Sequence, residues 1–192
     1  MEARLTLRRL LSIAALAAAV ATTSACGGGT DAAATTDSPL LKYSDSHVSF
    51  TYPAAWTAAQ PKGPSELHFQ PLVYLSTQRV GNPCSVHGNV TSCGWPIKRL
   101  GPRGVLVLWQ VPYSPGGPSG TPKGTRISVG GRDAWRTETT GGSCRRIGGT
   151  RTIEVWMPAR SIALTVCLRG PNVAQNERRV TALLASVAFP SQ

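Results

Sequence analysis

Acidic residues are scarce in this sequence. Only 9 Asp and Glu occur among 192 residues, against 20 Lys and Arg, so the formal net charge is +11. Histidine is also rare, with 3 residues in the whole chain. Because carboxylates and imidazoles supply most of the groups used in acid–base catalysis, this composition leaves few candidates for an active site.

Long hydrophobic runs are missing as well. The longest apolar run covers residues 10–20 (LLSIAALAAAV), and its 11 residues are too few to cross a bilayer, which takes about 20. Arg4, Arg8 and Arg9 precede this run, and small residues follow it up to Ala25. A positive start, a short apolar core and a small-residue exit are typical of a secretory signal peptide.

The cysteine directly after this segment is the first position with a specific chemical prediction. Thr23-Ser24-Ala25-Cys26 resembles the lipobox of bacterial lipoproteins, with Thr23 standing where that family usually has leucine. The resemblance implies that the chain is cleaved before Cys26 and that Cys26 carries lipid. The protein would then be anchored to the cell membrane on its extracellular side. The alternative is ordinary secretion, with Cys26 unmodified.

The remaining chain is long enough for one domain. We expect a signal peptide at 1–25, a flexible Gly/Ala/Thr-rich tether at 26–44 and a single domain at 45–192, which we expect to be monomeric. Removal of the signal peptide leaves 17 basic and 8 acidic residues, a net charge of +9. Outside the cytoplasm such a charge favours anionic headgroups or wall polymers over nucleic acid, unless it serves only to solvate the surface.

Four cysteines lie in this domain, and an even number in an exported protein favours disulfides. We predict Cys84–Cys93, which closes a short loop, and Cys144–Cys167. The alternative is a zinc site, because His87 lies between Cys84 and Cys93. The sequence contains no Cys-x-x-Cys or His-x₃-His spacing that would support a metal site.

Alternating apolar residues predict a largely antiparallel β-protein. Strands are expected at 48–52, 67–75, 125–129, 132–139, 150–157 and 161–168, and the continuous apolar run at 105–111 is expected in the centre of the sheet. The stretches 79–102 and 112–124 are rich in Pro and Gly and are expected to be loops. If the strands at 132–139, 150–157 and 161–168 form a meander, Cys144 and Cys167 meet at one edge.

A helix is expected at the C-terminal end. Asn172 is a plausible N-cap, and the apolar residues from Val180 to Val187 recur at helical spacing. We expect about 15 helical residues, ending near Phe189-Pro190. One helix covering an antiparallel sheet gives the α+β class.

Two segments of the domain resemble a known family. Phe50-Thr51-Tyr52-Pro53-Ala54-Ala55-Trp56 and Ala185-Ser186-Val187-Ala188-Phe189 are similar to the opening and the closing segments of small exported lipoproteins with a PsbP-like fold. The resemblance implies a PsbP-like α+β architecture, which serves mostly in binding or adaptor roles and has no common catalytic residues. The segment with Cys84 and Cys93 has no counterpart in that pattern.

No catalytic motif is present. The sequence lacks Gly-x-Ser-x-Gly, Ser-x-x-Lys, His-Glu-x-x-His and Walker A motifs, so we expect a protein that is not an enzyme and needs no cofactor or metal. Trp156 is out of phase with Val155 and Met157 and should therefore face the opposite side of the sheet. We predict that Trp135 or Trp156, with Arg136 or Arg151 nearby, lines a groove on an uncovered face.

These features together predict a lipid-anchored binding or adaptor module of the cell envelope. Its partner would be another envelope protein or an anionic wall polymer. The alternative function is an envelope hydrolase or transferase whose site is assembled from scattered residues. A third possibility is a structural coat protein.

Overall fold

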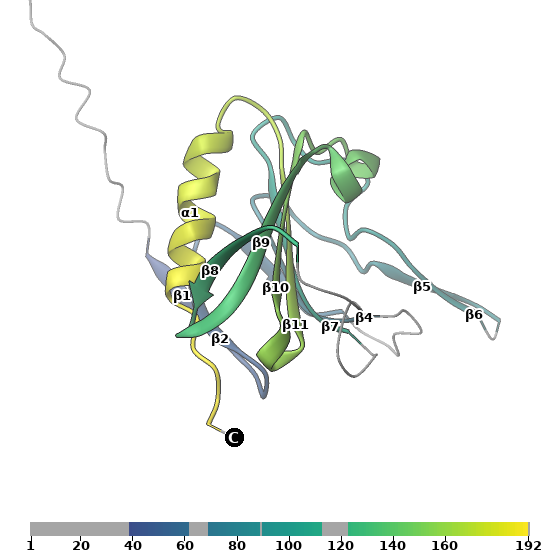
Figure 1. Ribbon diagram of the computed structural model, residues 1–192. Coiled ribbons are helices and arrows are strands. Elements are labelled where there is room, and N and C mark those ends of the chain that lie inside the picture. The colour runs from purple at the N-terminus through teal and green to yellow at the C-terminus, as the bar shows by residue number, and fades with distance from the viewer. Residues whose placement is uncertain (1–38, 62–68, 89, 113–122, 192) are drawn as a thin grey trace, which may run out of the picture. The chain divides into compact units, whose positions relative to one another are not determined.

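An antiparallel sheet forms the centre of the described chain (Figure 1). The computed structural model describes residues 39–61, 69–88, 90–112 and 123–191. The strands are β1 Leu40–Ser44, β2 Ser49–Pro53, β3 Thr57–Ala59, β4 Phe69–Ser76, β5 Cys84–His87, β6 Val90–Cys93, β7 Val105–Pro112, β8 Thr125–Val129, β9 Arg132–Thr140, β10 Arg151–Met157 and β11 Ile162–Leu168. The helices are η1 Gly142–Ile147 and η2 Pro158–Arg160, both 3-10, and α1 Val173–Ala185.

The central sheet has seven strands in the order β3-β4-β7-β11-β10-β9-β8, and β1–β2 and β5–β6 form two separate hairpins. All pairings in the central sheet are antiparallel. The α+β class with a covering C-terminal helix, expected from the sequence, is therefore confirmed.

Strand β7 is the interior strand that its continuous apolar sequence predicts. All residues from Val105 to Trp109 are buried, and the strand pairs with β4 on one side and β11 on the other. A strand covered on both faces has no position at which a polar side chain is favoured, which explains the apolar run.

The meander predicted from the last three strands is also confirmed. Strand β10 pairs with β9 and with β11, so the turn after β9 and the end of β11 lie at the same edge. Gly130 and Gly131 make the turn that joins β8 to β9. Their φ angles of 55° and 73° are those of a type I′ hairpin turn. Side chains with a Cβ are strained in that conformation.

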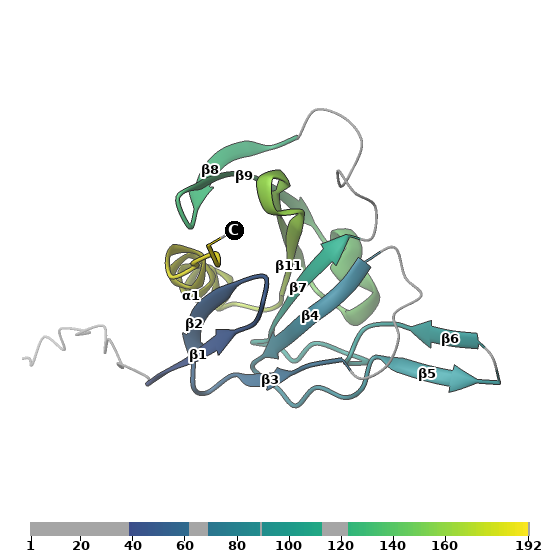
Figure 2. The same cartoon turned by 90° about the horizontal axis from the view of Figure 1, so that it is seen from below.

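One face of the sheet is covered by α1 and the β1–β2 hairpin, which lie on the same side of it (Figure 2). Helix residues Val180, Leu183 and Leu184 are buried in this core. Phe50 of β2 stacks on Trp109 of β7, with ring centroids 5.0 Å apart. The predicted helical stripe and the predicted inward residues of 48–52 thus meet in one core.

The opposite face is partly covered. Near the η1 end of the sheet, Ile97, Leu100 and Ile147 pack on the buried side chains of Leu106 and Leu108. The sequence predicts a groove on an uncovered face, and this cover was not predicted. The local sequence did not reveal the cover because it comes from irregular segments, which have no periodic pattern.

Three predicted boundaries are wrong. The tether does not extend to residue 44, because Leu40–Ser44 pairs with β2 as strand β1. Helix α1 ends at Ala185 rather than near Phe189, since Ala188 forms a β-bridge to Ser49. The stretch 79–102 includes the β5–β6 hairpin. In each case, pairing with a distant or neighbouring strand overrode weak local preferences. The loop predicted at 112–124 lies mostly outside the described residues.

Candidate functional site

Two tryptophans lie directly opposite each other on the face that α1 does not cover. Trp135 of β9 pairs with Trp156 of β10 in the antiparallel register. The neighbouring residue Val155 is buried in the core beneath α1, and side chains alternate along a strand, so Trp156 points to the other face. This orientation of Trp156 is the one predicted from the sequence.

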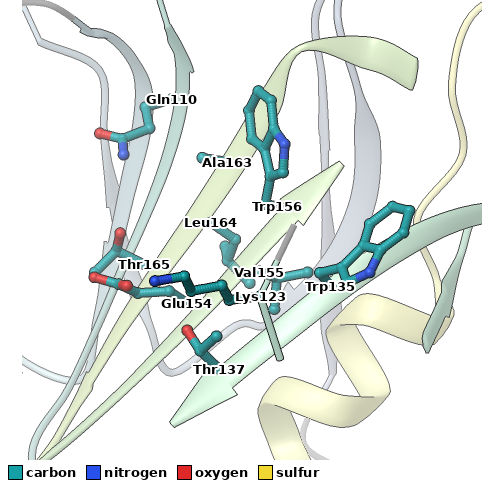
Figure 3. Close-up of a pocket in the computed structure, with 10 residues that line it drawn as sticks. All are labelled: Gln110, Lys123, Trp135, Thr137, Glu154, Val155, Trp156, Ala163, Leu164 and Thr165. Atoms are coloured by element: carbon teal, nitrogen blue, oxygen red, sulfur yellow. The ribbon is translucent and has the colours of Figure 1, made fainter. Parts of the chain in front are cut away.

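The register across four strands extends this tryptophan pair into a pocket. Gln110 of β7 pairs with Ala163 of β11, which pairs with Trp156. In the next row Thr165 pairs with Glu154, which pairs with Thr137. The resulting pocket has a volume of about 210 Å³ and is lined by Gln110, Lys123, Trp135, Thr137, Glu154, Val155, Trp156, Ala163, Leu164 and Thr165 (Figure 3).

The walls of this pocket differ in chemistry. The two indoles lie on one side, and the ends of Glu154, Thr165 and Lys123 lie on the other (Figure 3). Trp135 and Trp156 are half-buried, whereas Glu154 and Lys123 are exposed. The wall thus combines flat apolar rings with hydroxyl, carboxylate, ammonium and amide groups, which can both donate and accept hydrogen bonds. One carboxylate and one ammonium give it no net charge.

The predicted grouping of these tryptophans with Arg136 and Arg151 is wrong. Both arginines lie on the α1 side, where Arg136 contacts Glu138 at 2.5 Å and Glu177 of α1 at 2.6 Å, and Arg151 contacts Glu177 at 3.3 Å. Arg151 also pairs with Glu138, and this hydrogen bond raises the pKa of Arg151. Adjacent residues of a strand face opposite ways, so Arg136 cannot share a face with Trp135. We call these four residues the Arg136 network.

One predicted disulfide is present. Cys144 of η1 and Cys167 of β11 are bonded, with their Cα atoms 5.4 Å apart, and both are fully buried. Cys84 is also disulfide-bonded, and the β5–β6 register places it opposite Cys93. The side chain of Cys93 lies outside the described set, so Cys84–Cys93 stays a prediction.

The pocket contains residues that the sequence analysis missed, namely Gln110, Thr137, Glu154 and Thr165. None of these four residues belongs to a sequence motif. Period-two alternation places each of them on a face, but only the pairing of β7, β11, β10 and β9 brings them side by side. The strand register is the missing information, and a single sequence does not contain it.

Several predictions concern the chain terminus, metal binding and the membrane. Cys26 lies outside the described residues. Within the described parts of the chain, no group of three or more His, Cys, Asp or Glu residues could hold a metal ion. None of the helices described is long and apolar enough to span a membrane. No protein-family model, curated protein or solved structure matches this chain.

Proposed function

We propose that this protein is a non-enzymatic binding module of the cell envelope and that its ligand is a polyhydroxylated chain, such as a glycan, bound across Trp135 and Trp156. The observation that carries the proposal is the pair of half-exposed indoles beside hydrogen-bonding side chains. A sugar ring presents a C–H face that an indole can cover, while its hydroxyls need donors and acceptors at the edge.

The size and charge of the pocket favour this class of ligand. A volume of about 210 Å³ is smaller than the roughly 300–1,000 Å³ of sites that enclose a whole small molecule. The pocket therefore suits one unit of a longer chain. Because Lys123 and Glu154 offset each other in charge, a neutral ligand fits better here than an anionic polymer.

The number of carboxylates in the pocket supports a binding role rather than hydrolysis. Glu154 is the one carboxylate among the described residues that line it. Glycoside hydrolysis usually requires two carboxylates on either side of the scissile bond. A single exposed carboxylate is instead suited to accept hydrogen bonds from ligand hydroxyls.

The place of action is part of the same proposal and rests on the sequence. The signal-like segment at 1–25 and the lipobox-like Thr23-Ser24-Ala25-Cys26 support export and lipid anchoring at Cys26. An anchored domain on the extracellular side of the membrane would meet the glycan strands of the wall without further transport.

The proposal is tested by isothermal titration calorimetry with soluble oligosaccharides prepared from cell-wall glycan. We expect saturable binding to the parent protein and at least tenfold weaker binding to Trp135→Ala and to Trp156→Ala, because a central tryptophan at a binding site commonly contributes 2 kcal/mol or more. The control is Leu41→Ala, which removes an exposed apolar side chain from β1 and should bind like the parent. Equal affinity of all four proteins, or no heat with the parent, would refute the glycan assignment.

A further inference from the structure

Three irregular segments meet at the end of the sheet where η1 lies. The backbone N–H of Leu100 donates to the carbonyl of Ile147 at 2.7 Å, and the N–H of Arg169 donates to the carbonyl of Gly104 at 3.1 Å. The guanidinium of Arg169 also donates to the carbonyl of Leu100 at 2.7 Å. The segments 94–104, 141–150 and 169–172 are therefore fixed to one another.

The contact between two of these segments is very close. Gly170 has a φ of +88°, and a Cβ built there would lie 1.4 Å from the carbonyl oxygen of Pro102. Only glycine allows this approach. At Gly148, a Cβ would lie 3.1 Å from Nη1 of Arg169 and 3.8 Å from Cγ of Arg99. Side chains of the other two segments, Arg99 and Arg169, thus converge on Gly148.

The charges on these segments have one sign. They contain six basic residues and no acidic one: Lys98, Arg99, Arg103, Arg145, Arg146 and Arg169. We call this set the basic end. All of its members except the half-buried Arg169 are exposed, and none takes part in an ion pair recorded within the described residues. Figure 1 shows η1 and the β11–α1 connection at the same end of the sheet.

We infer that the basic end is a second binding surface, which contacts the phosphate headgroups of an anionic membrane. Guanidinium groups bind phosphate oxygens in pairs of hydrogen bonds, and four of the five exposed members are arginines. The cations stand on three separate segments, and this spread suits an array of headgroups better than one polymer strand. The inference goes beyond the proposed function and does not depend on the tryptophan pocket.

The test measures binding to lipid vesicles without the covalent anchor. The protein from residue 26 onward, with Cys26→Ser, retains every described element and is sedimented with vesicles of phosphatidylcholine, alone or with about one third phosphatidylglycerol. We expect binding to the anionic vesicles only, and weaker binding at high salt. Each cation near the surface contributes about fivefold, so the triple variant Arg99→Gln, Arg145→Gln and Arg146→Gln should bind about 100-fold more weakly.

Matched variants separate this surface from general charge. The control Lys42→Gln, Arg132→Gln and Arg160→Gln lowers the net charge by the same amount and should bind like the parent, as should Trp156→Ala. Replacing the three basic-end arginines by lysine keeps the charge but loses the paired hydrogen bonds, so this variant should bind more weakly than the parent and more tightly than the Gln triple variant. The inference is overturned if the two Gln triple variants bind equally, or if soluble polyphosphate at the same phosphate concentration binds the parent as tightly as the vesicles do.

Discussion

Tyr74 shows what burial does to a single titratable residue. Its side chain is 3% exposed and packs in the cluster around Leu100 and Leu106, on the face opposite α1. Burial raises its pKa to about 12. In the unfolded chain the pKa of tyrosine is about 10. The folded state therefore keeps this proton when the unfolded state has lost it, and the stabilisation is present below about pH 10 and disappears as the pH rises toward about 12.

We predict that Tyr74→Phe flattens the alkaline loss of stability. The parent should lose up to about 3 kcal/mol from this residue between pH 10 and pH 12, and the variant should lose correspondingly less. Urea unfolding of both proteins at a series of pH values gives the comparison. The pKa of Tyr43 is also raised to about 12, by burial and by a hydrogen bond to Asp45. The stability of the variant should therefore still fall somewhat with rising pH. Identical slopes for the two proteins would contradict the prediction.

Single residues were predictable where alternation alone decides. The phase of Trp156 relative to Val155 correctly places its indole on the face opposite the helix. The same alternation, applied to Arg136, excludes the predicted grouping with Trp135, because the two residues are adjacent in the chain. The error arose from treating proximity in sequence as proximity on a face.

Between elements, the Arg136 network joins the sheet to the helix. Glu177 of α1 binds both Arg136 and Arg151, and the side chains of Arg136 and Glu177 are only 22% and 24% exposed. Both arginines also contact Glu138, but without Glu177 the partly buried Arg136 would lose one of its two carboxylate partners and keep its desolvation cost. The network therefore fixes how α1 lies on β9 and β10.

We predict that Glu177→Gln lowers the free energy of unfolding by about 1–2 kcal/mol. The matched control is Asp133→Asn, which breaks the pair between Asp133 and Arg126 in the β8–β9 hairpin. Both members of that pair are well exposed, so its loss should have no measurable effect. Chemical denaturation of the three proteins tests this, and equal destabilisation by both substitutions would show that the network has no special role.

Elements with strong periodicity were predictable, and elements defined by their partners were not. The meander of β9, β10 and β11, the interior strand β7 and the closing helix all follow from their patterns. Strand β1 was not predictable, because four of its five residues are exposed. Its conformation comes from pairing with β2. The β5–β6 hairpin lies in a Pro- and Gly-rich stretch whose local signals favour a loop.

At the scale of the whole molecule, the proposed anchor predicts a specific mass. We expect the native, membrane-extracted protein to lack residues 1–25 and to carry acyl chains on Cys26. Denaturation and reduction should add about four hydrogens, two for each of the disulfides Cys144–Cys167 and Cys84–Cys93. Intact-mass spectrometry before and after reduction measures all of this at once.

The possible masses distinguish the alternatives. A cleaved chain without acyl groups would favour ordinary secretion over anchoring. A gain of only two hydrogens would contradict the disulfide at Cys84 and would reopen the zinc alternative at Cys84, His87 and Cys93. The variant Cys26→Ser should lose the acyl mass and be released from the membrane fraction.

The sequence by itself determined the α+β class, the meander of β9, β10 and β11, the interior position of β7 and the Cys144–Cys167 pair, because each depends on periodicity or on connections between successive strands. The tertiary structure alone decided which surfaces exist. The tryptophan pocket requires the register of four strands, and the basic end requires three segments separated by tens of residues to meet. Such contacts arise from packing between distant parts of the chain, and local sequence patterns carry no information about them.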